Sequence, residues 1–384
     1  TLTAASPAET EGQRDSVSNV IDGVRRESGN WTPDLPAGKA GQSLGNHRAV
    51  VLVDQHAPAV SVSIPWRRPD MNPQEKDVIV VDATTGRRVS DRLIAHVDNE
   101  AGRLVFRPNE GSTKYFIYYM PYKTTGGYYP TVTYLPPEST ADRDWLRSLG
   151  QVDDEALEAL PQARLVSLQS INDFHSFFPM EVIATSAETS AFPQNTSPTF
   201  YLFPESRHRP IRMRRYLPKH WVDRGRRDSF RAVARRGEYF TFQIGVYAAD
   251  QRLENVEVSF SDFVCDNGMT IERAAFTCFN TGGIDQHGQP FSKSVSVEKH
   301  EVQALWIGAQ IPSELAPATY AGSVTLSSEG HPAQSVKVYL QVVDKLVADH
   351  GDSHPENMCR LRWLNSTIGS EPDFIIAPFQ AVQV

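Results

Sequence analysis

Apolar and polar residues alternate over short runs along most of the chain, and Gly or Pro separates one run from the next. The clearest series lies in residues 303–344, where Ala304–Ile311, Tyr320–Leu326 and Ser335–Val343 are successive runs. Pro312 and Pro317 bracket the first turn of this series. Alternation with a period of two, interrupted by turn residues at regular spacing, is typical of an antiparallel β-sandwich.

The same pattern fills residues 46–137, which we interpret as a first β-sandwich. Turn sequences at Asp82–Gly86 and Asp98–Gly102 mark two of its hairpins. The expected strands are Arg48–Val53, Ala59–Ile64, Asp77–Asp82, Arg92–Val97, Gly102–Arg107 and Lys114–Tyr119.

Residues 138–190 break this rhythm and predict a short helical connector with bridging strands. Trp145 and Leu146 fall on one face of a first helix, and Asp153–Leu160 predicts a second. Arg164–Ile171 and Met180–Ala184 are the expected bridging strands.

Residues 191–348 predict a second, immunoglobulin-like β-sandwich that ends with the three runs described above. Its other expected strands are Thr199–Phe203, Tyr239–Ala248, Glu254–Phe260, Ala275–Phe279 and Ser292–Val297. The predicted fold class is therefore mainly β, with two antiparallel β-sandwich domains joined by a short helical connector.

The two ends of the chain differ from these modules. Residues 1–45 are polar and predict a flexible or draped N-terminal arm, with a short helix near Asp15–Arg26. Residues 349–384 predict a linker towards a further domain, because the β pattern stops after Asp349.

The composition excludes some functions. The net charge of −8 argues against a nucleic-acid binder, which needs a basic surface for phosphate. No run approaches the ~20 apolar residues of a membrane-spanning helix. No signal peptide is visible, but Thr1 is not an initiator Met, so that absence is uninformative.

The cysteines and a donor-rich loop leave alternatives open. Cys265 and Cys278 form either one bridge in an exported protein or two small buried apolar side chains, and the third cysteine is Cys359. His350, Asp352, His354, Glu356 and Cys359 lie within ten residues and suit either a metal site or a solvated linker. We predict no metal and no cofactor.

A strongly basic segment lies inside this acidic chain. Residues 207–236 hold twelve Lys and Arg against Asp223 and Asp228, so the segment carries +10 and the rest of the chain −18. These cations either pair with carboxylates within the protein or bind an anionic glycan. For the second alternative the candidate residues are Arg212, Arg214 and Arg215.

Aromatic residues suggest a further glycan contact. Trp66 next to two arginines, and Tyr128 and Tyr129 after the Gly126-Gly127 turn, are candidates for stacking on sugar rings. The alternative is that such rings belong to cores or seal a domain interface.

Motifs for catalysis are missing, and we predict no catalytic residue. Neither a nucleophile elbow, a zinc-protease helix, a P-loop nor a dinucleotide fingerprint occurs. Asp153, Asp154 and Glu155 would splay apart on a helix. An acid pair leaves no motif, so a complete small enzyme is a third hypothesis beside the two given below.

Several segments together resemble the N-terminal region of glycoside hydrolase family 123-like proteins. They are Gly45–Val50, Ile64–Arg68, Tyr118–Tyr122, Pro179–Ala184, Cys278–Gly283 and Arg360–Gly369, and the resemblance runs from about Gly45 to Val384. It implies that the sandwiches precede a TIM-like barrel that holds the catalytic acid pair and removes N-acetylgalactosamine with help from the substrate's acetamido group. No catalytic residue is carried over, because no position here matches one.

The resulting hypothesis is the non-catalytic N-terminal region of a secreted or periplasmic bacterial glycoside hydrolase, which supports the barrel and contacts glycan. Its partners would be carbohydrate and the C-terminal catalytic domain of the same polypeptide, with Arg360, Arg362 and Trp363 at the domain interface. The alternative is a stand-alone carbohydrate-binding or adhesin-like protein. Neither hypothesis involves nucleic acid or a membrane span.

Overall fold

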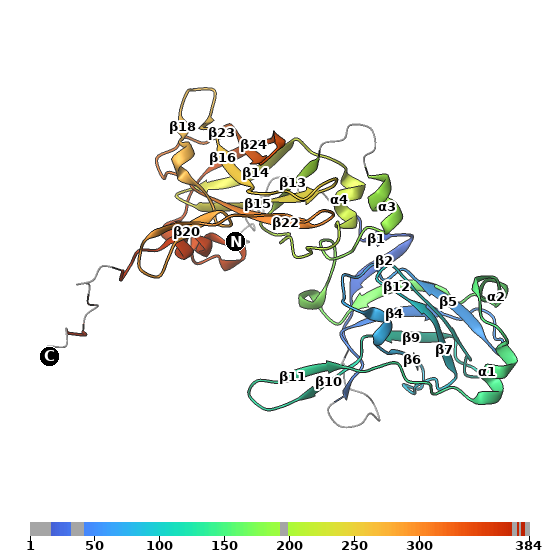
Figure 1. Cartoon of the computed structure of the whole chain (residues 1–384). Coiled ribbons are helices and arrows are strands. Elements are labelled where there is room, and N and C mark those ends of the chain that lie inside the picture. Colours follow the sequence, from blue (N-terminus) through green and yellow to red (C-terminus); the bar gives the residue numbers. More distant parts are fainter. Residues whose placement is uncertain (1–16, 32–41, 193–198, 371–374, 376–377, 381–384) are drawn as a thin grey trace, which may run out of the picture. The chain divides into compact units, whose positions relative to one another are not determined.

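The chain folds into two compact units, shown in Figure 1. The structure, a computed structural model, describes residues 17–31, 42–192, 199–370, 375 and 378–380. The first unit holds residues 17–187 and 218–220, and the second holds the other described residues. The chain passes between them within α3 (Ser186–Ala191), just before α4 (Lys219–Arg224) and within α4.

The first unit is a β-sandwich of a six-stranded and a three-stranded sheet. The larger sheet has the order β1 (Val20–Ile21), β2 (Val24–Ser28), β12 (Arg164–Ser170), β4 (His47–Leu52), β9 (Lys114–Tyr119) and β6 (Val78–Asp82). The smaller sheet has the order β5 (Val60–Ile64), β8 (Gly102–Phe106) and β7 (Arg92–Val97). Neighbouring strands are antiparallel except β2 and β12, which run parallel.

Alternate residues of these strands form the core between the two sheets. Val51 of β4, Ile117 of β9 and Leu104 of β8 all belong to it. The outer face of the smaller sheet is covered by α1 (Arg143–Leu149) and α2 (Asp154–Ala159), whose Trp145 and Leu157 cluster with Val105. Each face of a strand thus buries its own set of side chains, as a period of two requires.

A small third sheet completes the first unit. It consists of the hairpin β10 (Tyr122–Thr125) and β11 (Thr131–Tyr134) with β3 (Gln42–Ser43) at one edge. Figure 1 shows this hairpin extending from its unit. Two 3-10 helices, η1 (Pro73–Glu75) and η2 (Asp173–His175), lie in loops of the same unit.

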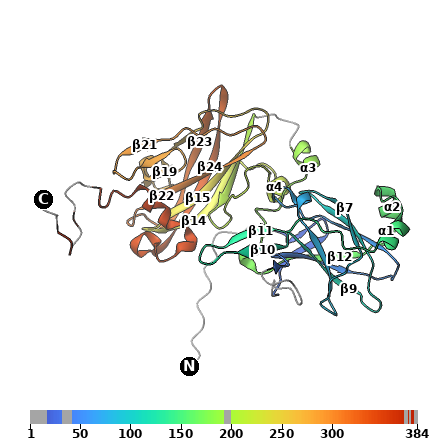
Figure 2. The same cartoon turned by 60° about the horizontal axis from the view of Figure 1, so that its bottom comes forward.

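The second unit is also a sandwich. Its four-stranded sheet has the order β13 (Phe200–Ser206), β15 (Tyr239–Ala248), β22 (Val302–Gln310) and β19 (Phe276–Cys278). The opposing sheet contains β14 (Ser229–Arg236), β24 (His331–Leu346), β23 (Ala318–Ser328), β17 (Phe263–Val264) and β18 (Thr270–Ile271), and β16 (Glu257–Phe260) also pairs with β23. Figure 2 shows β14 beside β24, the one parallel pair among the described strands of this unit.

The remaining elements of the second unit are short. They are the hairpin β20 (Gly282–Ile284) and β21 (Pro290–Ser292) and the 3-10 helices η3 (Arg273–Ala275), η4 (Ala348–Gly351), η5 (Pro355–Asn357) and η6 (Cys359–Asn365).

Strand β15 is buried along its whole length and organises the second unit. Its inward residues, such as Phe242 and Ile244, join the core between the sheets. Its outward face is covered by irregular chain, because Gln243 bonds to the backbone of Ile211 and Thr241 donates to the carbonyl of Asn357. Segments 207–217 and 348–365 therefore lie on the outer face of the four-stranded sheet.

The predicted mainly β class with antiparallel sandwiches is confirmed, and most expected strands are present within a few residues. The helix expected near Asp15–Arg26 is wrong for the residues described, because this stretch forms β1 and β2 at an edge of the larger sheet. The strand expected at Met180–Ala184 is also wrong; only Ile183 makes an isolated bridge. Of Ser292–Val297, only Ser292 lies in a strand.

The units also differ from the expected segments. The helices and β12 of the connector 138–190 belong to the first sandwich, because Trp145, Leu157 and Leu168 join its buried clusters. Much of the expected arm, residues 1–16 and 32–41, lies outside the described residues. The described start of the expected linker, residues 349–365, is folded against β15. No helix in the described part of the chain has the length and apolarity needed to cross a membrane.

All three cysteines are free and buried, which decides between the two alternatives for Cys265 and Cys278. Burial raises the pKa of the Cys278 thiol and raises that of Cys359 to about 11. The thiolate is the reactive form, so these two thiols are inert near neutral pH.

We expect no thiol of the native protein to react with an aromatic disulfide reagent at pH 8, and all three to react in denaturant. Intact-mass measurement after alkylation checks this result. A protein that gains only one alkyl group in denaturant without reductant would contradict the three free thiols.

A close approach at Gly245 gives a second prediction. A Cβ added there would lie 2.3 Å from the Trp221 ring, so Gly245→Ala must displace a buried indole. We expect a loss of about 2 kcal/mol in unfolding free energy, measured in urea, because overpacking in a core is destabilising. Gly127→Ala is the matched control, since nothing lies within 4 Å of its added Cβ. Equal loss in both variants would contradict this packing.

Candidate functional site

Tyr128 and Tyr129 lie at the tip of the β10–β11 hairpin. Their side chains are 91% and 86% exposed, and their rings meet edge to face with centroids 5.0 Å apart. Gly126 has a φ of 94°, a conformation that favours glycine and allows the chain to turn there. Two large rings held in solvent at a turn form a surface on which a flat apolar ligand face can stack.

Trp66 does not share this exposure, and its predicted role as a stacking platform is wrong. Its side chain is 3% exposed. The centroids of the Trp66 and Tyr119 rings lie 4.4 Å apart. A Cβ at Gly102 would fall 2.3 Å from the Trp66 ring, so the indole packs directly against that backbone. Trp66 instead belongs to a core, which was the alternative interpretation of the aromatic residues.

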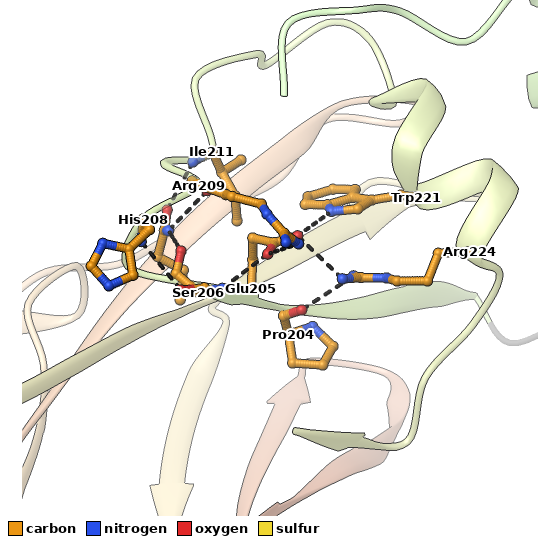
Figure 3. A network of polar contacts seen from close by, with 9 residues as sticks. Pro204, Glu205, Ser206, His208, Arg209, Ile211, Trp221 and Arg224 are labelled. Carbon is orange, nitrogen blue, oxygen red and sulfur yellow. Dashed lines mark hydrogen bonds and ion pairs between the residues drawn. The ribbon is translucent and has the colours of Figure 1, made fainter. Parts of the chain in front are cut away.

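At least five of the twelve cations of the basic segment pair with carboxylates of the second unit. Figure 3 shows the carboxylate that several of these contacts share, the buried Glu205 near the end of β13. The Trp221 indole Nε1 donates to Glu205 Oε2 at 3.1 Å, and Arg224 Nη1 donates to the same oxygen at 3.2 Å. Arg209 Nη1 lies 3.5 Å from the other oxygen.

Backbone groups complete this cluster. The amide of Ser206 donates to Glu205 Oε1 at 3.0 Å, and Arg224 Nη2 donates to the carbonyl of Pro204 at 3.2 Å. The Trp221 ring stacks on Phe203 with centroids 4.5 Å apart. A buried carboxylate needs such donors, because removing a charge from water costs several kcal/mol. The segment is thereby fixed on the outer face of the sheet.

A second buried pair joins the basic segment to the C-terminal segment. Arg207 Nη1 donates to Glu238 Oε1 at 2.6 Å and contacts the carbonyl of Asn357. Nearer the surface, Arg214 pairs with Glu301 and Arg236 with Asp344. Of the two alternatives for the basic segment, pairing with carboxylates within the protein therefore accounts for these five arginines.

The three glycan candidates of this segment are exposed but differ in their contacts. Arg214 donates through Nε to Glu301 at 2.6 Å. Arg212 and Arg215 lie in the same exposed stretch. All three belong to the second unit, whereas Tyr128 and Tyr129 belong to the first.

Arg360, Arg362 and Trp363 gather around Asp352. Arg360 Nε donates to the Asp352 carbonyl at 2.9 Å, and Trp363 Nε1 donates to its carboxylate at 3.1 Å. Arg362 pairs with the same carboxylate. The ring of Trp363 is nonetheless 51% exposed, next to the exposed Leu364. These residues thus order the end of the second unit and leave an apolar surface there.

Side chains of the donor-rich loop 350–359, and two other acidic residues, make structural contacts. No group of three or more metal-ligating side chains gathers in the described parts of the chain. Asp352 accepts from Arg362 and Trp363, and Cys359 is buried. Asp153 caps α2. Burial raises the pKa of Asp77, but this carboxylate receives Arg92 Nη2 on both oxygens.

Sequence reasoning missed the residues that hold these segments, namely Glu205, Glu238 and Gln243. A signal was present in Tyr239–Ala248, where Thr241 and Gln243 interrupt an apolar strand at a spacing of two. Polar residues on one face of a fully buried strand indicate covering chain that bonds to them.

Replacement of Glu205 tests the buried cluster. We expect Glu205→Gln to lower the unfolding free energy by about 3 kcal/mol, because Arg224 loses its charged partner in a buried site. Glu301→Gln is the control: its partner Arg214 is 67% exposed, and such pairs contribute about 0–1 kcal/mol. Urea unfolding of both variants provides the comparison, and equal losses would contradict the assignment.

Comparison with known proteins points to one family for part of the chain. Residues 40–171 match the family described as glycoside hydrolase 123, N-terminal domain. No curated protein sequence matches the chain significantly. The match agrees with the resemblance predicted from the sequence motifs and lies within the first unit.

Solved structures with partial likeness include a family 123 glycoside hydrolase from Clostridium perfringens that hydrolyses glycolipid glycans. It is 21% identical over 38% of this chain, with a TM-score of 0.31, and the match spans 28% of that chain. A PapD-like domain of human CEP192 is 14% identical over 40% of this chain and 93% of its own, with a TM-score of 0.24. These scores are too low to support an argument. Residues 40–171 are a glycoside hydrolase-associated domain similar to the N-terminal domain of family 123.

Proposed function

We propose that this chain is the non-catalytic β-sandwich region of a secreted or periplasmic glycoside hydrolase, and that it supports a catalytic barrel of the same polypeptide and contacts glycan. The observation that carries the proposal is the match of residues 40–171 to an N-terminal domain of glycoside hydrolases. The assignment of export rests on the resemblance of the sequence to that family alone.

The most deeply buried carboxylates that pair with arginine have structural partners, which supports a non-catalytic role for those residues. Glycoside hydrolysis needs two carboxylates that face each other across an accessible substrate site. Asp77, Glu205 and Glu238 are the most deeply buried carboxylates with arginine partners, and their oxygens accept from Arg92, Arg224 and Arg207. Carboxylates held in this way stabilise the sandwiches instead of serving as acid and base.

The end of the second unit supports the proposed junction. Asp352 fixes Arg362 and Trp363, while the Trp363 ring and Leu364 stay exposed. Phe291 is exposed on the β20–β21 hairpin, which contacts η6. Exposed apolar residues beside an ordered polar anchor are typical of a surface that another domain covers. The occupant that we propose is the catalytic barrel.

The β10–β11 hairpin supports the glycan contact and favours a second candidate function. Tyr128 and Tyr129 need no barrel to meet a ligand, because they are exposed in the first unit. A stand-alone carbohydrate-binding or adhesin-like protein would use the same two rings. The two functions differ in whether a catalytic domain belongs to the same polypeptide.

The purified 384-residue chain provides the first test. We expect no release of N-acetylgalactosamine from an aryl glycoside, and weak binding of glycans that contain it. Hydrolysis that is lost on replacement of a single Asp or Glu would contradict the non-catalytic role. An intact mass of the protein from its native source far above 42.8 kDa favours the hydrolase, and a matching mass favours the stand-alone binder.

The tyrosine variants test the glycan contact. We expect the double replacement Tyr128→Ala and Tyr129→Ala to weaken glycan binding by about tenfold or more, since an aromatic hot spot contributes over ~1 kcal/mol. Phe174→Ala is the matched control, an aromatic residue of the same unit that is 87% exposed. Equal affinity of the double variant and the control, measured by calorimetry, would remove the hairpin from the glycan site.

A further inference from the structure

One sheet of the second unit presents its outer face to solvent. Segments 207–217 and 348–365 cover the outer face of the four-stranded sheet, whereas the outward side chains of the opposing sheet are exposed or half-buried. We use the name open face for the odd-numbered residues of 229–235 in β14, 335–343 in β24 and 319–327 in β23, strands that lie side by side (Figure 2). Their even-numbered neighbours, such as Leu340, belong to the core.

Tyr339 lies in the middle of the open face. Its direct partners across the sheet are Arg231 of β14 and Ala321 of β23. The Arg231 guanidinium lies 4.1 Å from the centroid of the Tyr339 ring, which holds the two side chains together. Ala321 is exposed and ends in a single methyl group, so it fills little of the space on the other side of the ring. Strands in a sheet are about 4.8 Å apart, and one ligand can therefore reach the ring and the guanidinium together.

The charges of the open face have one sign. Arg231 and Lys337 are exposed, and neither makes an ion pair with a carboxylate of the described chain. Arg235 also points outward, and the outward positions of the three strands include no Asp or Glu. Carboxylates lie only at the margins, at Asp228 directly before β14 and at Glu257 on β16. The open face thus displays cations of the basic segment that its internal pairs do not use.

The other positions carry short polar side chains. Ser323 lies directly opposite Lys337, and Thr319 lies opposite Gln341. Hydroxyl and amide groups both donate and accept hydrogen bonds. A solvated sheet face is ordinarily polar and mixes charges of both signs. Unpaired cations beside a ring and hydroxyl groups instead match a ligand that offers anionic groups, hydroxyls and an apolar face.

We propose that the open face binds an acidic polysaccharide, with Arg231 and Lys337 on its anionic groups and the Tyr339 ring against one of its sugars. Each acidic sugar combines a carboxylate or sulfate with hydroxyl groups and a C–H face. An acidic peptide would satisfy the cations but would leave the ring and the hydroxyl groups without matching partners. The inference is independent of the proposed glycan contact at Tyr128 and Tyr129, which belong to the other unit.

Calorimetric titration of the whole 384-residue chain provides the test. We expect polygalacturonate to bind, and its methyl ester, which keeps the sugars and lacks the charge, to bind at least tenfold more weakly. Added salt should weaken the binding, because it screens exposed charges. Dextran sulfate distinguishes the two anionic groups: tighter binding than polygalacturonate identifies sulfate, and weaker binding identifies carboxylate.

Variants locate the binding on the open face. We expect the double replacement Arg231→Gln and Lys337→Gln to weaken binding by about tenfold or more, since a hydrogen bond to a charged group corresponds to roughly that factor. Lys293→Gln with Lys299→Gln is the matched control, because it removes the same charge from exposed positions of the same unit outside the open face. Tyr339→Thr should weaken binding about threefold or more through loss of the ring.

Four results would overturn the proposal. They are equal binding of the methyl ester, equal binding of polyglutamate, wild-type affinity in the double variant, and loss of binding in the Tyr128→Ala, Tyr129→Ala variant. Equal binding of polyglutamate would assign the open face to an acidic protein partner, and the last result would move the site to the β10–β11 hairpin. Urea unfolding shows whether the double variant is folded. If it is not, the single replacement Lys337→Gln decides the outcome.

Discussion

Buried pairs of arginine and carboxylate hold irregular chain against the sheets of this protein. Glu205 with Arg224, and Glu238 with Arg207, do so on the outer face of the four-stranded sheet. A buried carboxylate that loses its partner destabilises a fold by several kcal/mol, so each pair ties the position of one segment to that of another. The full burial of β15 follows, because segments 207–217 and 348–365 can then cover it.

This constraint changes how the charge of the chain relates to function. A net +10 in residues 207–236 suggests a surface for anionic ligands, but its strongest contacts are internal. Exposed aromatic rings lie elsewhere, at the Tyr128–Tyr129 tip and at Trp363. Such rings suit stacking on a ligand and docking of a partner, the two contacts that we propose.

Much of the fold could be predicted from the sequence, because alternation with a period of two directly records which face of a strand is buried. Arg92–Val97 and Tyr239–Ala248 were expected with the bounds that the structure has. The helix expected near Asp15–Arg26 was wrong, because this stretch pairs as a strand and Arg26, which is half-buried, donates to two carbonyls far along the chain. A charged residue that pairs inside the protein carries no local signal of its burial.

The candidate site was harder to predict for the same reason. Tyr128 and Tyr129 follow a Gly-Gly turn, and turns are normally exposed, so their exposure could be expected. Trp66 follows Pro65 and precedes two arginines, which suggests exposure, yet its ring lies on the backbone of Gly102. Arg68 shares that contrast, since two aromatic rings bury its guanidinium. Long-range contacts decide such positions, and one sequence does not record them.

The internal pairing of the basic segment is the central claim, and backbone hydrogen exchange tests it most directly. We predict that the amide of Ile211, which donates to buried Gln243, exchanges as slowly as the strand amides of β15. Peptides from the exposed tip at Tyr128 should exchange within seconds and provide the reference. Exchange of residues 207–217 at the rate of that tip would contradict the account, because the segment would then be free to meet a ligand.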